Sequence, residues 1–146
     1  MIQWAIVAAY ILAMFVFTRQ DVSSAGYTAQ LLARWFPQLS SAELRQLVWL
    51  LRKAGHVLAY AVLTLLVYSA SRSTKRLRGR ALIIAVLTAL LVAAADESYQ
   101  RRLQHRSGAW MDVLIDSLGT AAVAAALGLR SSARKKHREV VEKDAE

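Results

Sequence analysis

Four carboxylates stand at the ends of two long apolar runs of the sequence. Asp96 and Glu97 close one run, whereas Asp112 and Asp116 open the next one. A spacing of four residues places Asp112 and Asp116 on one face of a helix. Because a charge buried in lipid is costly, ionisable residues at such positions are candidate functional residues.

A histidine preceded by two cations begins another apolar run. Arg52 and Lys53 come shortly before His56. The spacing of Lys53, His56 and Tyr60 places these three side chains on one helical stripe. Imidazole exchanges a proton near pH 7, a neighbouring carboxylate can orient it, and Arg and Lys bind anionic groups. Together these side chains predict acid–base chemistry on an anionic substrate.

In this enzymatic interpretation, His56 is the general base or nucleophile and Glu97 is its orienting or proton-carrying partner. The expected catalytic residues are His56, Glu97, Asp96 and Asp112. The expected ligand-binding residues, among which the cations form a phosphate clamp, are Arg52, Lys53, Tyr60, Gln100, Arg106, Trp110 and Asp116. One histidine with scattered carboxylates is a weak signature for a divalent metal, so no metal ligand is assigned and the cofactor is left open.

The composition indicates a small integral membrane protein. The chain has 146 residues, of which 56% are hydrophobic, a larger share than is usual in a soluble domain. Its net charge of +9 comes from short cationic blocks beside apolar runs and not from a basic face interleaved with aromatic residues, so nucleic-acid binding is not expected. The absence of cysteine excludes disulfides, thiol catalysis and thiolate metal sites.

Four apolar runs predict an all-α integral membrane four-helix bundle, and they cover residues 2–17, 55–70, 81–95 and 113–129. The first run lacks the positively charged segment that precedes the apolar part of a secretory signal peptide, so we expect it to remain as a span. The expected domains are a four-span membrane domain over residues 1–130 and a charged cytoplasmic tail over residues 131–146.

The residues ahead of the second apolar run predict the start of a helix. Ser40 and Glu43 have the spacing of a capping box, and Leu39 can pack against Leu44 as a hydrophobic staple. We expect a long helix from this point, with its first third along or above the membrane surface. The preceding segment, residues 21–39, is expected to lie in the membrane interface or to form a loop packed on the bundle.

The distribution of Lys and Arg predicts the orientation in the membrane. Residues 71–80 and 130–146 together hold 11 of the 19 Lys and Arg side chains, and such dense cationic segments belong in the cytoplasm. Four spans then place both termini in the cytoplasm. At ~1.5 Å per helical residue, His56, Asp96 and Asp116 each lie ~21–24 Å from the cytoplasmic cations. We therefore expect an outward-facing polar pocket near the outer edge of the membrane, with Arg106 or Arg102 over its mouth.

Several blocks of the sequence resemble the VanZ-like family of small bacterial membrane proteins. They are R-K-x-x-H-x-x-x-Y at residues 52–60, D-E-x-x-Q at residues 96–100, Arg106, and W-x-D-V-x-x-D-x-x-G at residues 110–119. The resemblance extends over about residues 52–128, and Asp116 stands where that family pattern has Asn. It implies a multi-pass protein of the bacterial cytoplasmic membrane. The founding member is associated with low-level resistance to the glycopeptide teicoplanin, and the family implies no defined reaction.

Three interpretations of the polar residues remain open. In the first, polar contacts between spans only stabilise helix packing. His56 then pairs with Glu97 or Asp96, and a cation from residues 52–53 pairs with Asp112. In the second, the cluster catalyses a reaction on a lipid-linked phosphate or cell-wall precursor in the outer leaflet.

In the third interpretation, the cluster binds a lipid head group, a glycopeptide or a proton without breaking a bond. Small residues between Gly119 and Gly128 allow the last span to pack closely below the cluster. No ionisable residue lies deeper than Asp116 in any span, which argues against a continuous proton path to the cytoplasm. Membrane lipids are the expected partners in all three interpretations.

Overall fold

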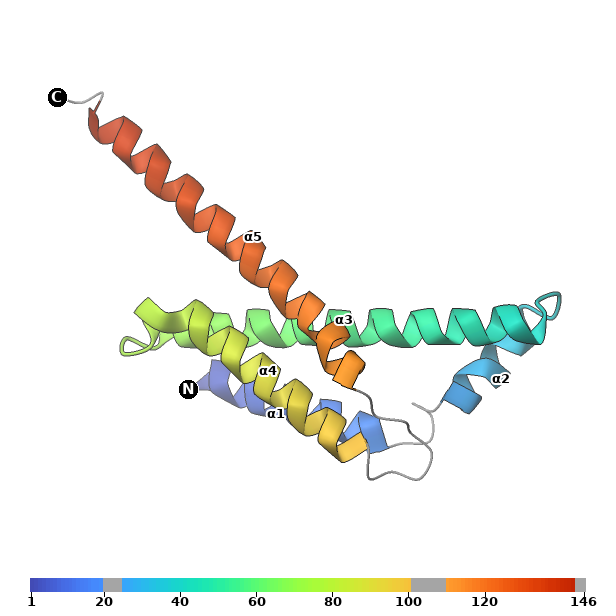
Figure 1. The fold of residues 1–146 in the computed structure, drawn as a ribbon. Helices are drawn as coiled ribbons and strands as arrows, with labels where there is room; N and C mark the ends of the chain where they lie inside the picture. The colour runs from blue at the N-terminus through green and yellow to red at the C-terminus, as the bar shows by residue number, and fades with distance from the viewer. Residues whose placement is uncertain (20–24, 101–109, 144–146) are drawn as a thin grey trace.

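The computed structural model describes residues 1–19, 25–100 and 110–143, and these residues form an all-α fold. Its helices are α1 (Ile2–Arg19), α2 (Ala25–Trp35), α3 (Ser41–Ser73), η2 (Arg78–Arg80), α4 (Ala81–Gln100) and α5 (Trp110–Lys143). Figure 1 shows α1 and α4 beside the second half of α3, α2 beside its beginning, and α5 crossing α3 before it continues away. The predicted all-α class is confirmed.

Three segments of these helices are long and apolar enough to cross a membrane, namely Ser41–Ser73, Arg78–Tyr99 and Val113–Ala133. A fourth segment, Ile2–Phe17, is an apolar helix of shorter length. The expected multi-pass membrane protein is confirmed by the three long segments. The fourth span and the orientation in the membrane stay predictions.

Helix α3 begins where the capping box of the sequence predicts. The Ser40 backbone N–H donates to Glu43 Oε2 at 2.8 Å, and the Glu43 N–H donates to Ser40 Oγ at 3.3 Å. These two bonds satisfy backbone donors that a helix start leaves without intrahelical partners. From there α3 runs for 33 residues, or ~50 Å, which exceeds the ~30 Å hydrocarbon core of a bilayer.

The segment before α3 contains a helix that the sequence left undecided between an interfacial segment and a loop. Helix α2 is made mostly of Ala, Gln, Leu and Arg, which favour helices, and it ends two residues before Pro37. It contacts α3, yet none of its residues is buried. Leu31 and Trp35 therefore keep much of their apolar surface exposed.

The contact between α3 and α4 is built from a row of alanines. Ala81, Ala85, Ala89 and Ala93 are spaced four residues apart, so they share one face of α4, and all four are buried. On α3 the buried apolar residues are Tyr60, Leu63, Val67 and Ala70. Small side chains let two helix backbones approach closely where lipid supplies little hydrophobic drive for association. The alanine row therefore provides the close approach of α4 to the larger side chains of α3.

Helix α1 runs antiparallel to α3. Trp4 Nε1 donates a hydrogen bond to Thr74 Oγ1 at 3.1 Å, and the Tyr10 hydroxyl donates to the Ala59 carbonyl at 3.1 Å. The beginning of α1 is thereby held at the turn that joins α3 to α4. The beginning of α1 and the cationic residues of this turn consequently lie at the same end of the bundle.

Helix α5 crosses α3 at Gly119 with almost no space between the two backbones. A Cβ atom at Gly119 would overlap the carbonyl oxygen of Val57 and lie 3.0 Å from the Ala61 nitrogen. One residue further along α5, the hydroxyls of Thr120 and Thr64 are hydrogen-bonded to each other at 3.2 Å. Past this crossing α5 stays helical to Lys143, so the described part of the predicted tail continues the last span (Figure 1).

We predict that Gly119→Ala destabilises the protein, because the added methyl group has to push α5 away from the α3 backbone. Overpacking of this kind costs about 1–3 kcal/mol, which thermal unfolding of the purified protein in detergent would detect as a lower Tm. Gly128→Ala is the matched control on the same helix, since a Cβ there meets nothing within 4 Å. It is expected to leave the Tm unchanged or to raise it through helix propensity. Equal Tm values for the two variants would contradict the close crossing.

Candidate functional site

Helix α4 ends with two consecutive buried carboxylates. Asp96 and Glu97 lie in its last turns, and both are buried. Neighbouring residues of a helix point in directions ~100° apart, so burying both requires packing on two sides. Helix α4 has this packing because it contacts both α3 and α5. Asp116, near the beginning of α5, adds a third buried carboxylate at the same end of the bundle.

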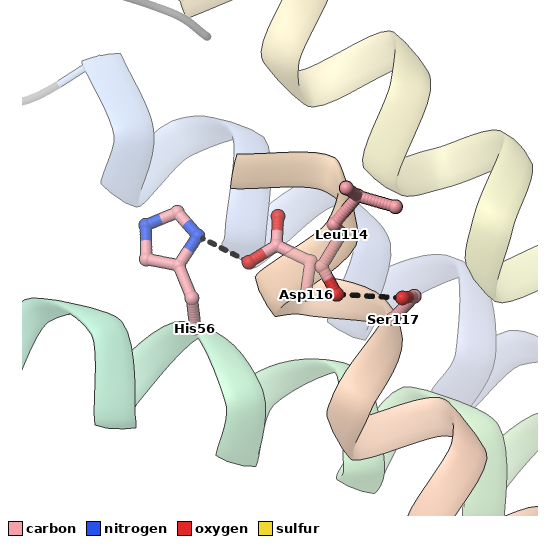
Figure 2. A network of polar contacts seen from close by, with 4 residues as sticks. All are labelled: His56, Leu114, Asp116 and Ser117. Atoms are coloured by element: carbon pink, nitrogen blue, oxygen red, sulfur yellow. Dashed lines mark hydrogen bonds and ion pairs between the residues drawn. The ribbon is translucent and has the colours of Figure 1, made fainter. Parts of the chain in front are cut away.

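A hydrogen bond joins the histidine of α3 to the carboxylate of α5. His56 Nδ1 lies 3.1 Å from Asp116 Oδ1, as Figure 2 shows. The Asp116 side chain is 3% exposed, whereas the His56 side chain is 27% exposed. In the same figure the Ser117 hydroxyl turns away from the site and donates to the Leu114 carbonyl of its own helix. Asp116 is thus the residue of this turn that reaches across to α3.

The direction of the His56–Asp116 bond determines what the imidazole can do. When Asp116 is ionised, its carboxylate only accepts hydrogen bonds, and Nδ1 then carries the hydrogen and donates it to Asp116. The other ring nitrogen, Nε2, is then the basic nitrogen, and it lies on the side of the ring away from Asp116 (Figure 2). A carboxylate that fixes a histidine tautomer in this way also stabilises the imidazolium formed when Nε2 takes up a proton. The pair therefore has the geometry of an oriented general base.

Tyr60 lies one helical turn deeper than His56 and is only 1% exposed. Its phenol is within electrostatic range of the three buried carboxylates, Asp96, Glu97 and Asp116. Asp96 is close enough to interact with the hydroxyl, although their geometry falls outside that of a formed hydrogen bond. The Tyr60 hydroxyl therefore points into the acidic cluster from α3.

The polar stripe of α3 continues one turn below Tyr60. The Thr64 hydroxyl donates a hydrogen bond to the Tyr60 carbonyl at 2.7 Å, and it also lies within hydrogen-bonding distance of Thr120 Oγ1, at 3.2 Å. Both threonines are buried. Their hydroxyls close the polar region on the side that faces the bundle interior.

Two cations lie above the His56–Asp116 pair on α3. Arg52 and Lys53 are both half-buried, and each is engaged in at least one polar, ring or electrostatic interaction. They stand about one turn before His56, which corresponds to ~5–6 Å along the helix axis. The positive groups of the site therefore lie nearer to the exposed end of α3 than the buried carboxylates do.

The structure brings five of the eleven sequence-derived residues together at one end of the bundle, with Arg52 and Lys53 about one turn before His56. His56, Tyr60, Asp96, Glu97 and Asp116 lie there together. Arg106 lies outside the described residues, and so do the side chains of Gln100, Trp110 and Asp112, so their expected roles stay predictions. Among the described residues, no three His, Asp or Glu side chains come close enough together to hold a metal ion.

Sequence reasoning missed two features of the site. It paired His56 with Glu97 or Asp96, whereas the hydrogen bond in the structure is to Asp116. It also overlooked the contact between Thr64 and Thr120. A signal for the second feature was present, because Thr64 lies four residues after Tyr60 and Thr120 lies four residues after Asp116. Both threonines thus extend the predicted polar stripes by one turn.

Comparison with known proteins places the chain in a family. No curated protein and no solved structure matches it. The family model of VanZ/LLP1 does match, over residues 3–130. This match includes the apolar part of every span candidate and all the residues of the polar cluster. The matched range also covers the sequence blocks around His56, Asp96 and Asp116. The chain therefore belongs to the VanZ/LLP1 family.

Proposed function

We propose that this VanZ-family membrane protein binds an anionic lipid or cell-wall precursor of the cell envelope and performs acid–base chemistry on it. The hydrogen bond between His56 Nδ1 and Asp116 Oδ1 carries this proposal. It combines a buried carboxylate with a histidine that keeps 27% of its side chain exposed. A substrate at the membrane surface can thus approach Nε2 while Asp116 holds the ring from inside.

The proposed roles follow from the position of each group. His56 takes a proton from the nucleophile, which is a water or a substrate hydroxyl, and Asp116 stabilises the resulting imidazolium. Asp116 thereby replaces Glu97 as the orienting partner. Asp96 and Glu97, buried beside Tyr60, supply or hold protons on the α4 side of the site. General acid–base catalysis by one such group typically contributes about 10²–10⁴-fold to a rate.

The substrate class is proposed from charge and from location. Arg52 and Lys53 lie just above His56, and cations in this position favour a phosphate or carboxylate group. The surrounding apolar helices restrict access to molecules that enter from the lipid or from the membrane surface. Phosphate-bearing envelope lipids and lipid-linked cell-wall precursors have both properties. A lipophilic glycopeptide is a further candidate ligand, because the family is associated with resistance to teicoplanin.

The orientation that this function requires places the polar cluster near the outer surface of the bacterial cytoplasmic membrane. The turn between α3 and α4 holds Arg72, Lys75, Arg76, Arg78 and Arg80, all of them exposed. Such a concentration of cations favours the cytoplasmic side. His56 lies at the opposite end of the apolar part of α3, and the outward direction follows from this placement.

A second candidate function is purely structural. The contact between Thr64 and Thr120 and the backbone contact at Gly119 occur at the same crossing as the His56–Asp116 bond. Polar contacts between membrane helices stabilise their packing, typically by about 0.6–2 kcal/mol each. In this alternative the His56–Asp116 bond only holds α3 against α5, and no substrate is needed.

Replacement of His56 by Gln separates the two candidates. Glutamine keeps a neutral side chain that donates and accepts hydrogen bonds, but it cannot exchange a proton near pH 7. We expect His56→Gln to insert and fold with a nearly unchanged Tm while activity falls by about 10²–10⁴-fold. The measurements are thermal unfolding in detergent and phosphate release from polyprenyl diphosphate in nanodiscs, with glycopeptide tolerance as the cellular readout.

The control for this experiment is Ser117, the residue that follows Asp116 in α5. Ser117→Ala removes a hydroxyl that bonds only within its own helix, so both activity and Tm should stay at the wild-type level. Asp116→Asn should lower activity and favour the wrong imidazole tautomer. A His56→Gln protein with full activity would rule out acid–base chemistry at this histidine and leave the structural role.

The orientation has its own test, which uses the absence of native cysteine. Single cysteines at Gln38 and at Ser73 replace exposed residues on either side of the apolar part of α3. We expect an impermeant maleimide added to whole cells to label Gln38→Cys and to label Ser73→Cys only after the cells are opened. Labelling in the reverse pattern would place the polar cluster on the cytoplasmic side and remove outer-leaflet substrates from consideration.

A further inference from the structure

Helix α3 extends beyond the bundle that packs against it. The face of α3 that meets the other helices is defined by Tyr60, Leu63 and Val67, all of them buried. The same stripe continues toward the beginning of the helix through His56 and Lys53 to Trp49, with steps of three and four residues. Helix α4 ends at Gln100 and α5 begins at Trp110. Helix α3 continues past both of these helix ends toward α2 (Figure 1).

The stripe is exposed at Trp49 and buried at Tyr60, next to the cluster. Trp49 is 56% exposed, Lys53 is half-buried, the His56 side chain is 27% exposed, and Tyr60 is 1% exposed. An exposed aromatic ring, a cation, an imidazole and a buried phenol therefore follow one another on a single helix face. This order leads from the surface of the protein to the acidic cluster.

The direction in which Trp49 points distinguishes it from an ordinary membrane anchor. The exposed apolar side of α3 includes Leu58 and Leu65. Leu58 comes nine residues after Trp49, and nine steps of ~100° place the two side chains on opposite sides of the helix. Trp35 on α2, which is 71% exposed, lies outside this stripe and serves as a comparison. The Trp49 indole is thus exposed on the side of α3 that carries the polar cluster.

We propose that Trp49 recognises a sugar, so that the ligand of the site is a sugar joined through phosphate to a lipid. This inference rests on the proposed function and specifies its substrate class. The Trp49 position lies ~6 Å beyond Lys53 and ~10 Å beyond His56 along the helix axis. A phosphate near Arg52 and Lys53 therefore has room for one sugar ring above it, where the apolar face of the ring stacks on the indole. The lipid chain extends in the opposite direction, into the bilayer.

The order of groups in the ligand follows from the order of residues in α3. Moving from the membrane outward, the ligand presents a lipid chain, a phosphate linkage and a sugar. In the same direction α3 presents its apolar span, the cations with His56, and Trp49. A phosphate-bearing lipid without a sugar leaves the indole uncovered and is expected to bind less tightly.

The test compares two lipids that share the polyprenyl chain and the diphosphate, of which only one carries a sugar. Purified protein is titrated in phosphatidylcholine nanodiscs that contain polyprenyl diphosphate or the same lipid carrying N-acetylglucosamine. We expect the wild type to bind the sugar-bearing lipid roughly three- to tenfold more tightly, since aromatic stacking contributes in that range. Trp49→Ala should remove this preference, and Trp49→Tyr, which keeps a ring face, should retain most of it. Trp35→Ala is the matched control and should preserve the wild-type ratio.

Each outcome bears on a different part of the inference. A sugar preference that survives in Trp49→Ala, or that is absent from the wild type, overturns the role of Trp49. If N-acetylglucosamine 1-phosphate in solution binds as tightly as the lipid, the lipid-linked ligand is overturned. A preference that depends on Trp49, together with unchanged turnover in His56→Gln, supports sugar recognition while rejecting acid–base chemistry at His56. If Trp49→Ala lowers the Tm, Trp49→Leu serves as the control, because it keeps an apolar side chain of similar bulk but has no ring face.

Discussion

Helices α3 and α5 touch backbone to backbone at Gly119, and the polar contacts between them depend on that approach. With no side chain at this position, the α5 backbone comes against the carbonyl of Val57. One turn before the contact, Asp116 is brought within hydrogen-bonding distance of His56. One residue after it, Thr120 meets Thr64. Two side-chain pairs from distant parts of the sequence thus share a single steric requirement.

The buried carboxylates make one end of the bundle electrostatically unfavourable. Asp96, Glu97 and Asp116 all lie within electrostatic range of Tyr60, and each is buried. Like charges in a medium of low dielectric constant repel one another, and their desolvation adds to the cost. The remainder of the described core is mostly alanine and aliphatic side chains. The unfavourable free energy of burying carboxylates is thus confined to one region. Functional sites commonly show this pattern, because they hold groups that chemistry needs even where these groups destabilise the fold.

The sequence was most informative where structure is determined locally. The capping box at Ser40 depends on residues three apart, so the start of α3 could be predicted from spacing alone. The apolar runs and the polar stripe from Lys53 to Tyr60 follow from helical periodicity in the same way. Gly119 was recognised as a small residue suited to close packing. The structure of the α2 segment could not be predicted from its composition, because a short amphipathic segment fits an interfacial helix and a packed loop equally well.

The partner of His56 could not be obtained in this manner. Asp96, Glu97 and Asp116 lie at similar depths, so distance along the helices does not distinguish between them. The choice depends on how α4 and α5 are rotated about their axes. That rotation is set by contacts between helices, namely the alanine row from Ala81 to Ala93 and the crossing at Gly119. Such contacts join residues far apart in the chain, and periodicity within one helix contains no information about them.

The continuity of α5 gives the molecule a mechanical property. A single helix runs from the acidic cluster through the crossing and on to Lys143. The distance from Gly119 to Lys143 along it is ~36 Å at the usual rise per residue. With the crossing acting as a fulcrum, a tilt of ~10° moves the far end by ~6 Å, a displacement larger than the rise of one helical turn. An event at Asp116 that changes the angle of α5 is therefore amplified at the opposite end of the helix, as by a lever.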